Sequence, residues 1–155
     1  MSKISIDQVP ETDRTSPKAR FSSRRRDISK ALGPDGKRRP FEVGWVSIPP
    51  GAAYCPYHSH SGDWEHYIFV RGEGRVRHPG GTETVGPGDH ALFPPGVPHQ
   101  LFNESSEPFV YYVVANNVEG SDNCYYPDSD KWALDFEPGG GIVRTKAVDY
   151  FEGEE

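Results

Sequence analysis

The sequence predicts an all-β domain built from many short strands, arranged as a sandwich or a barrel. The 155 residues include 17 Gly and 15 Pro, about a fifth of the chain, which leaves no room for the long helices of a bundle or coiled coil. Aromatic residues make up 12% of the chain, whereas disordered chains are poor in them. Short runs of strand-forming residues alternate with turns rich in Gly and Pro, which is the pattern of an antiparallel β-domain.

The chain divides into three zones by composition. Residues 1–40 form a polar, basic arm, residues 41–116 carry the strand signals, and residues 117–155 form a C-terminal extension. Within the arm, Ser23 precedes residues 24–32, and Gly33 follows them. A Ser before a helical stretch and a Gly after it are typical caps, so we expect one short helix there.

Residues 41–116 are expected to hold about eight strands, because turn sequences such as PPG, PGG and PPGVP interrupt them regularly. The expected ranges are 41–48, 54–60, 64–71, 74–78, 83–85, 90–93, 99–103 and 109–115. The C-terminal extension is rich in aromatic residues, so we expect it to pack on the barrel and cover an edge or an opening. Residues 142–148 are a candidate for one more strand.

The net charge of −6 conceals an uneven distribution. Residues 1–40 hold 11 Lys and Arg against 5 Asp and Glu, a net of +6, whereas the remainder has a net of −12. The arm could bind nucleic acid, or it could pack on the acidic remainder of this chain or of a second copy. No recognition helix, zinc finger or aromatic-basic RNA motif accompanies it, so we expect packing and no nucleic-acid partner.

The sequence favours a cytoplasmic protein without a membrane span. No apolar run reaches the roughly 18 residues that a span needs, and the N-terminal residues contain no apolar stretch typical of a secretory signal. Two cysteines, Cys55 and Cys124, are too few for a disulfide scaffold and suit a reducing compartment.

Four residues of metal-ligand type lie at suggestive spacing. His58 and His60 are two residues apart, so on a strand both imidazoles point to one face. Glu65 shares its strand face with aromatic residues, where a carboxylate is costly unless it is paired or bound to a cation. His99 leads a strand that can run beside the first pair. Three nitrogen ligands and one carboxylate suit a single divalent transition metal, Fe, Mn, Ni, Co, Cu or Zn.

Two segments carry a family resemblance. GAAYCPYHSHSGDWEHYIFVRG, residues 51–72, resembles the first conserved motif of the cupins, with six residues rather than five between Gly51 and His58. GDHALFPPGVPHQLFN, residues 88–103, resembles their second motif at every defined position. These positions are Gly88, Pro94, Gly96, His99 and Asn103.

The resemblance implies a cupin-type jelly-roll β-barrel with one metal inside. By the same resemblance, the metal ligands are His58, His60, Glu65 and His99. The C-terminal segments YPDSDKW and DYFEGEE are similar to those of small bacterial cupins, some of them named sugar-phosphate isomerases.

Further residues are candidates for a substrate pocket beside the metal. Tyr54 and Tyr112 are the acid/base candidates, because a phenol can donate a proton to a substrate oxygen. For the others, packing in the core is the alternative to contact with substrate. They are Trp45, Pro56, Tyr67, Phe69, Phe93 and Leu101.

Two classes of function fit these observations. As an enzyme, the protein would act on a small polar, oxygen-rich metabolite, by isomerisation or epimerisation through proton transfer, or by dioxygenation with Fe(II). As a binding or sensing module, it would hold such a metabolite without converting it. The enzyme is favoured, because the chain carries no DNA-binding domain through which a sensor could act. Ile68 and Val70 point away from the metal face, which favours a homodimer.

Overall fold

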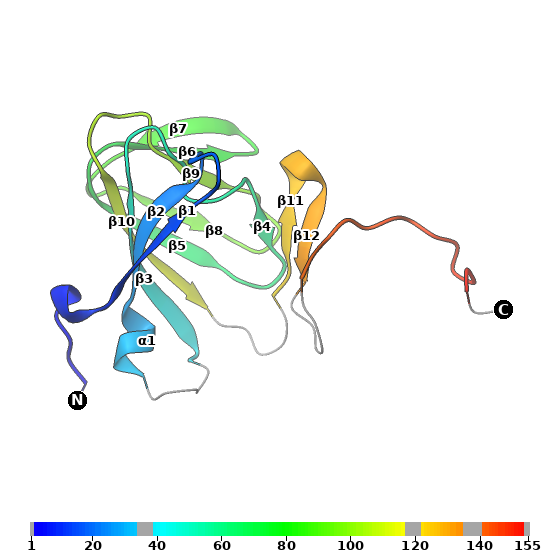
Figure 1. Cartoon of the computed structure of the whole chain (residues 1–155), viewed down its shortest axis with the longest axis horizontal. Helices are drawn as coiled ribbons and strands as arrows, with labels where there is room; N and C mark the ends of the chain where they lie inside the picture. Colours follow the sequence, from blue (N-terminus) through cyan, green and yellow to red (C-terminus); the bar gives the residue numbers. More distant parts are fainter. Residues whose placement is uncertain (1, 34–38, 117–121, 135–140, 154–155) are drawn as a thin grey trace.

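Three antiparallel sheets make up the computed structural model, which describes residues 2–33, 39–116, 122–134 and 141–153 (Figure 1). The largest sheet has the order β1 (Glu11–Thr15), β2 (Ser22–Asp27), β3 (Phe41–Ile48), β10 (Phe109–Asn116), β5 (Glu65–Arg71), β8 (His90–Phe93). A three-stranded sheet has the order β7 (Gly81–Val85), β6 (Gly74–His78), β9 (Gln100–Phe102). A four-stranded sheet has the order β13 (Gly141–Val143), β12 (Lys131–Leu134), β11 (Cys124–Tyr126), β4 (Ser59–His60). The all-β prediction is confirmed.

The core consists of side chains from the six-stranded and three-stranded sheets. Phe109 and Tyr111 of β10 are fully buried, and from Tyr111 to Val114 buried and half-buried residues alternate along the strand. The rings of Phe69 and Phe109 stack with centroids 5.4 Å apart. Val76 of β6 belongs to the same cluster. Burying large rings in this way contributes most of the favourable free energy of such a fold.

The basic arm packs on the barrel as a strand hairpin, and the expected helix over residues 24–32 is wrong at its start. β2 extends the sheet to Asp27, and only Ile28–Leu32 is helical (α1). The reason is tertiary, because Arg24 and Arg26 lie across from the acidic residues of β1 while β2 pairs with β3 on its other side. Residues 34–38, which contribute to the basic arm, lie outside the described residues.

The other helices that the structure describes are single 3₁₀ turns at Ile6–Gln8 and Pro127–Ser129. In the described part of the chain, no helix has the length and apolar character needed to cross a membrane.

Two strands are much shorter than the sequence predicts, and the ranges 64–71 and 99–103 lose one or two residues at their ends. Within residues 54–60 only Ser59–His60 forms a strand, since Pro56 has no N–H for a ladder and the segment is held by single hydrogen bonds, such as Tyr54 N–H to the Leu101 carbonyl. In the C-terminal extension Gly141–Val143 pairs with β12, whereas the remainder of the range 142–148 is not strand. The β11–β12 hairpin lies beside β4, which carries His60 (Figure 1).

Candidate metal centre

His58 and His99 face each other across an isolated antiparallel bridge. Each donates its backbone N–H to the carbonyl of the other, with N···O distances of 3.1 and 2.8 Å. Opposed residues of a bridge present their side chains on the same face, and here the two ring centroids lie 4.8 Å apart. Both side chains are buried. The two cupin-like motifs thus meet at these histidines.

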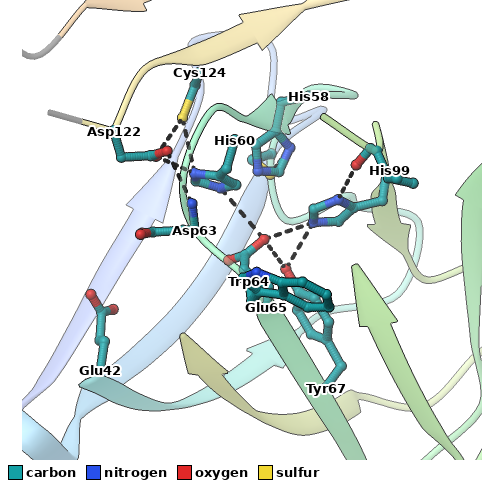
Figure 2. A network of polar contacts seen from close by, with 12 residues as sticks. Glu42, His58, His60, Asp63, Trp64, Glu65, Tyr67, His99, Asp122 and Cys124 are labelled. Carbon is teal, nitrogen blue, oxygen red and sulfur yellow. Dashed lines mark hydrogen bonds and ion pairs between the residues drawn. The ribbon is translucent and has the colours of Figure 1, made fainter. Parts of the chain in front are cut away.

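His60 and Glu65 complete the cluster (Figure 2). His60 is placed by a hydrogen bond from the Gly96 N–H to its carbonyl, which Gly96 can make in the left-handed region at φ +81°. Glu65 begins β5, and its Oε2 lies 2.8 Å from His99 Nε2 and 3.4 Å from His60 Nε2. The ligand atoms of His58, Glu65 and His99 therefore lie within 4.8 Å of one another, and His60 joins them through its contact with Glu65.

The second ring nitrogen of each histidine has its own partner. His58 Nδ1 lies 3.0 Å from the Pro56 carbonyl, and His99 Nδ1 lies 3.2 Å from the Val97 carbonyl. His60 Nδ1 lies 2.5 Å from Asp122 Oδ2. A proton held on Nδ1 by such an acceptor leaves Nε2 as the atom that can bind a metal, and at His99 a metal would replace the Nε2 proton that Glu65 Oε2 accepts. This is the arrangement that metal-ligating histidines require.

The electrostatics of the cluster also fit a cation. Burial and the neighbouring His99 lower the pKa of His58 to about 4, so His58 is in the neutral, ligating form. Burial alone would raise the pKa of Glu65, but the hydrogen bond to His99 and the nearby His60 hold it at about 2. Burial lowers the pKa of His60, but Cys124, Glu65 and Asp122 together raise it to about 10. A metal at His60 must therefore displace a proton.

Two aromatic side chains contact the cluster and hold His99 and Glu65 in place. The ring of Phe93 stacks on His99, with centroids 4.1 Å apart and planes 10° apart. The Tyr67 hydroxyl donates to Glu65 Oε2 at 2.9 Å. These contacts fix the ring and the carboxylate, so the donor set is preorganised.

A cavity of about 270 Å³ opens beside the cluster. Charged, polar and small apolar residues line it. They are Arg14, Arg25, Glu42, Tyr54, Cys55, Pro56, His58, His60, Asp63, Glu65, Val113, Ala115, Cys124 and Tyr126.

Tyr54 is held in this cavity by an arginine of the basic arm. Arg25 Nη1 donates to the Tyr54 hydroxyl oxygen at 2.8 Å, and the same guanidinium pairs with Asp27 and Glu42. Burial raises the pKa of Tyr54, and Arg25 opposes that rise. Because the Tyr54 oxygen accepts from Arg25, its own proton is available to another acceptor.

The structure distributes the other pocket candidates among three places. Tyr54 and Pro56 line the cavity. Tyr67 and Phe93 contact the ligands, whereas Phe69 and Leu101 lie in the hydrophobic core.

Trp45 and Tyr112 do not line the cavity. They are directly paired across β3 and β10, on the face opposite to buried Val46 and Tyr111, and the Arg26 guanidinium lies over the Trp45 ring. Strand parity is the physical reason, because neighbouring residues point to opposite faces.

Sequence reasoning missed several cavity residues. Cys124 and Tyr126 come from the C-terminal extension, and Arg14 and Arg25 come from the β1–β2 hairpin. Asp122, which contacts His60 without lining the cavity, was missed as well. The alternation of Asp122, Cys124 and Tyr126 was the available signal, since alternate residues of a strand share a face. Nothing in the sequence shows that this strand pairs with β4.

Residues 44–115, which contain both histidine motifs, match the family profile described as a Cupin domain. The protein is therefore a small cupin-domain protein. No curated protein matches the sequence.

Two solved structures resemble nearly the whole chain, and a third resembles three quarters of it. One, named a sugar phosphate isomerase from a cupin superfamily, from Silicibacter pomeroyi, is 24% identical, with a TM-score of 0.78 and 92% of each chain covered. Another, provisionally named a sugar phosphate isomerase, from Acidithiobacillus ferrooxidans, is 19% identical, with a TM-score of 0.79 and coverage of 93% and 92%. A predicted oxalate decarboxylase from Thermotoga maritima is 18% identical, with a TM-score of 0.62, covering 75% of this chain and 99% of its own. At these identities the likeness concerns the fold.

Proposed function

We propose that the protein is a metal-dependent enzyme that acts on a small, polar, oxygen-rich metabolite by proton transfer of the isomerase or epimerase type. One observation carries the proposal. The same cavity of about 270 Å³ is lined by two ligand-type imidazoles, three carboxylates, two arginines and the Tyr54 side chain. A cavity of this size and polarity suits a metabolite with several oxygens and excludes a large apolar ligand.

The metal ligands in this proposal are His58, His60, Glu65 and His99. A divalent transition metal held by them would polarise a carbonyl or hydroxyl oxygen of the substrate, and Fe, Mn, Ni, Co, Cu and Zn all suit the donor set. Glu65, with its pKa of about 2, is ionised and serves as a ligand rather than as an acid.

Other residues of the cavity would bind the substrate and donate a proton to it. Tyr54 acts as the proton donor, since Arg25 occupies its oxygen and leaves its O–H free. Arg14 lies exposed in β1 and lines the cavity, where its guanidinium can pair with a carboxylate or phosphate of the substrate. The β1–β2 hairpin thus contributes to substrate binding in this proposal.

The first test is metal analysis of protein purified without chelators, followed by NMR of candidate substrates in D₂O. Sugar phosphates come first, because the structures from Silicibacter pomeroyi and Acidithiobacillus ferrooxidans bear that name. We expect about one transition metal per chain and metal-dependent deuterium incorporation, both lost in His99→Ala. Oxygen consumption with Fe(II) would contradict the isomerase proposal and support dioxygenation. Binding of a metabolite without either reaction would support a binding or sensing role instead.

Replacing Tyr54 with Phe tests the proton donor. We expect Tyr54→Phe to lower kcat by roughly 10²- to 10⁴-fold, the usual contribution of a general acid, with metal content unchanged. Tyr112→Phe is the matched control, because it removes a hydroxyl from the opposite face of the sheet, and its kcat should stay within about twofold. Equal activities of the two variants would exclude Tyr54 as the donor.

We also propose that the protein acts as a homodimer in the cytoplasm. The outer face of the six-stranded sheet carries Ile68, Val70 and Leu92, and the last two are 40% and 56% exposed. Both cysteines are free, which suits a reducing compartment.

A further inference from the structure

The C-terminal extension contacts two of the ligand histidines directly. Asp122 lies two residues before the start of β11. Both Asp122 and Cys124 contact His60 Nδ1. The Tyr126 ring stacks on His58, with centroids 6.2 Å apart. These side chains are alternate residues on one face of the segment. All of them lie outside residues 44–115, the range that matches the cupin profile.

Asp122 uses both carboxylate oxygens to fix the loop between the ligands. Its Oδ2 lies 2.5 Å from His60 Nδ1, and its Oδ1 accepts from the backbone N–H groups of Gly62 and Asp63 at 2.9 and 3.3 Å. The Ser61 hydroxyl also donates to Oδ1, at 3.4 Å. One side chain therefore orients a ligand ring and ties down the turn that leads from His60 to Glu65 (Figure 2).

We propose that Asp122 is a positioning residue that holds the proton on His60 Nδ1 and turns Nε2 toward the metal, so that the C-terminal extension completes the metal centre. The inference rests on the proposed metal site but on no particular reaction. Carboxylates in this role sharpen ring orientation and raise the basicity of the ligating nitrogen, and their loss costs 10- to 100-fold in metal affinity.

The same atoms could instead hold a second ion, because His60, Asp122 and Cys124 offer three ligand atoms within 4.8 Å of one another. The contact between His60 Nδ1 and Asp122 Oδ2 argues against this. Two atoms that each lie about 2.0 Å from one tetrahedral ion are roughly 3.3 Å apart, whereas these lie at 2.5 Å. That separation is even shorter than the roughly 2.7–2.9 Å of charge-assisted N–H···O hydrogen bonds, so it fits a short hydrogen bond better than two ligands of one ion.

Asp122→Asn is the informative variant because it keeps the shape of the side chain. If its NH₂ group faces His60, it favours the tautomer protonated on Nε2, which cannot bind metal. If the NH₂ group faces Gly62 and Asp63 instead, it opposes their two backbone N–H donors, and the hydrogen bonds that hold the loop are lost. Asp128→Asn is the matched control, because Asp128 lies on the same hairpin and pairs with Arg77 through two hydrogen bonds at 2.7 and 2.9 Å.

The experiment measures Co(II) affinity, Co(II) release rate and the Co(II) absorption spectrum of the full chain. We expect Asp122→Asn to weaken Co(II) binding 10- to 100-fold, to speed release and to shift the visible bands. Asp128→Asn should change the affinity less than twofold. In a His60→Ala background, Asp122→Asn should have no further effect on residual binding, because Asp122 acts through His60. Thermal unfolding of the metal-free variants shows that each is folded.

The outcomes separate this inference from the proposed function. Wild-type protein that binds no Co(II) would overturn the metal site itself. Wild-type binding with an unchanged Asp122→Asn affinity and spectrum would overturn the positioning role alone. Two Co(II) per chain, with one lost in Cys124→Ser, would also overturn it, since His60 Nδ1 would then be a ligand.

Discussion

Each histidine of the candidate metal centre has its Nδ1 atom beside a residue outside the proposed ligand set. The carbonyls of Pro56 and Val97 lie against the Nδ1 atoms of His58 and His99, and these carbonyls are each two residues before the histidine they orient. His60 depends on Asp122 from far along the chain. The local contacts are part of the histidine motifs, whereas the distant one requires the whole fold.

The pKa of Glu65 makes the stability of the metal-free protein depend on pH. Its pKa of about 2 in the folded state lies below the ordinary 4.5, so its contribution is present above pH 4.5 and is lost as pH falls through 2. The quantity to measure is the difference in the free energy of unfolding between the wild type and Glu65→Gln, obtained by urea denaturation with a chelator. We expect this difference to be about 3 kcal/mol larger at pH 6 than at pH 2.

His60 should show the opposite dependence. Its pKa is raised to about 10, so its contribution is complete below the ordinary 6.5 and is lost as pH rises through 10. For Glu65, the contradicting outcome is a difference in the free energy of unfolding between wild type and Glu65→Gln that stays constant from pH 6 to pH 2. That result would contradict the assigned ionisation of Glu65.

Among the elements, the turns decide where the strands can meet. Gly72 joins β5 to β6 at φ +74°, and a Cβ there would lie 2.3 Å from the Pro108 carbonyl oxygen. Both facts exclude a side chain, which explains why a glycine stands at the end of the first motif. The strand that carries Glu65 is thereby held against the end of β10.

Gly72→Ala should destabilise the protein. Backbone strain in the left-handed region and the clash with Pro108 predict a loss of about 1–3 kcal/mol in the free energy of unfolding, measured by chemical denaturation. Gly86→Ala is the control, since a Cβ at Gly86 meets no atom within 4 Å, and it should change stability little. Equal stabilities of the two variants would show that the turn relaxes around the new side chain.

At the scale of the whole molecule, part of the basic arm pairs with the acidic remainder of the chain in one sheet. The β1–β2 hairpin extends the six-stranded sheet, and its Arg25 lines the cavity instead of remaining free for nucleic acid. The opposite end of the same sheet is β8, whose outward Leu92 is 56% exposed. The outer face near β8, where Ile68, Val70 and Leu92 lie beside His66 and His90, is the proposed contact between two copies.

Leu92→Asp should separate the proposed dimer. A charge placed at the centre of an apolar contact is costly to desolvate, so we expect a mass near the monomer's 17.3 kDa by light scattering at micromolar concentration, against about twice that mass for the wild type. Ile142→Asp, at another exposed apolar residue, should remain dimeric. A monomeric wild type would exclude the dimer.

The sequence by itself determined the β-class and the positions of most strands, because period-two alternation is a local property of the chain. Motif spacing also pointed to His58, His60, Glu65 and His99, which the fold brings together and which stand as the proposed ligand set. It could not distinguish a helix from a strand at residues 24–27, since that choice depends on pairing with β1 and β3. Tyr112 was assigned to the pocket for the same lack of register information.

Only the tertiary structure decided what surrounds the metal centre. Arg25 reaches Tyr54 because a hairpin joins one edge of the barrel, and Asp122 reaches His60 because β11 pairs with β4. Such contacts join residues separated by 29 and 62 positions, and no local pattern encodes them. They form because the sheets bury a common core, which brings distant polar groups to the rim of one cavity.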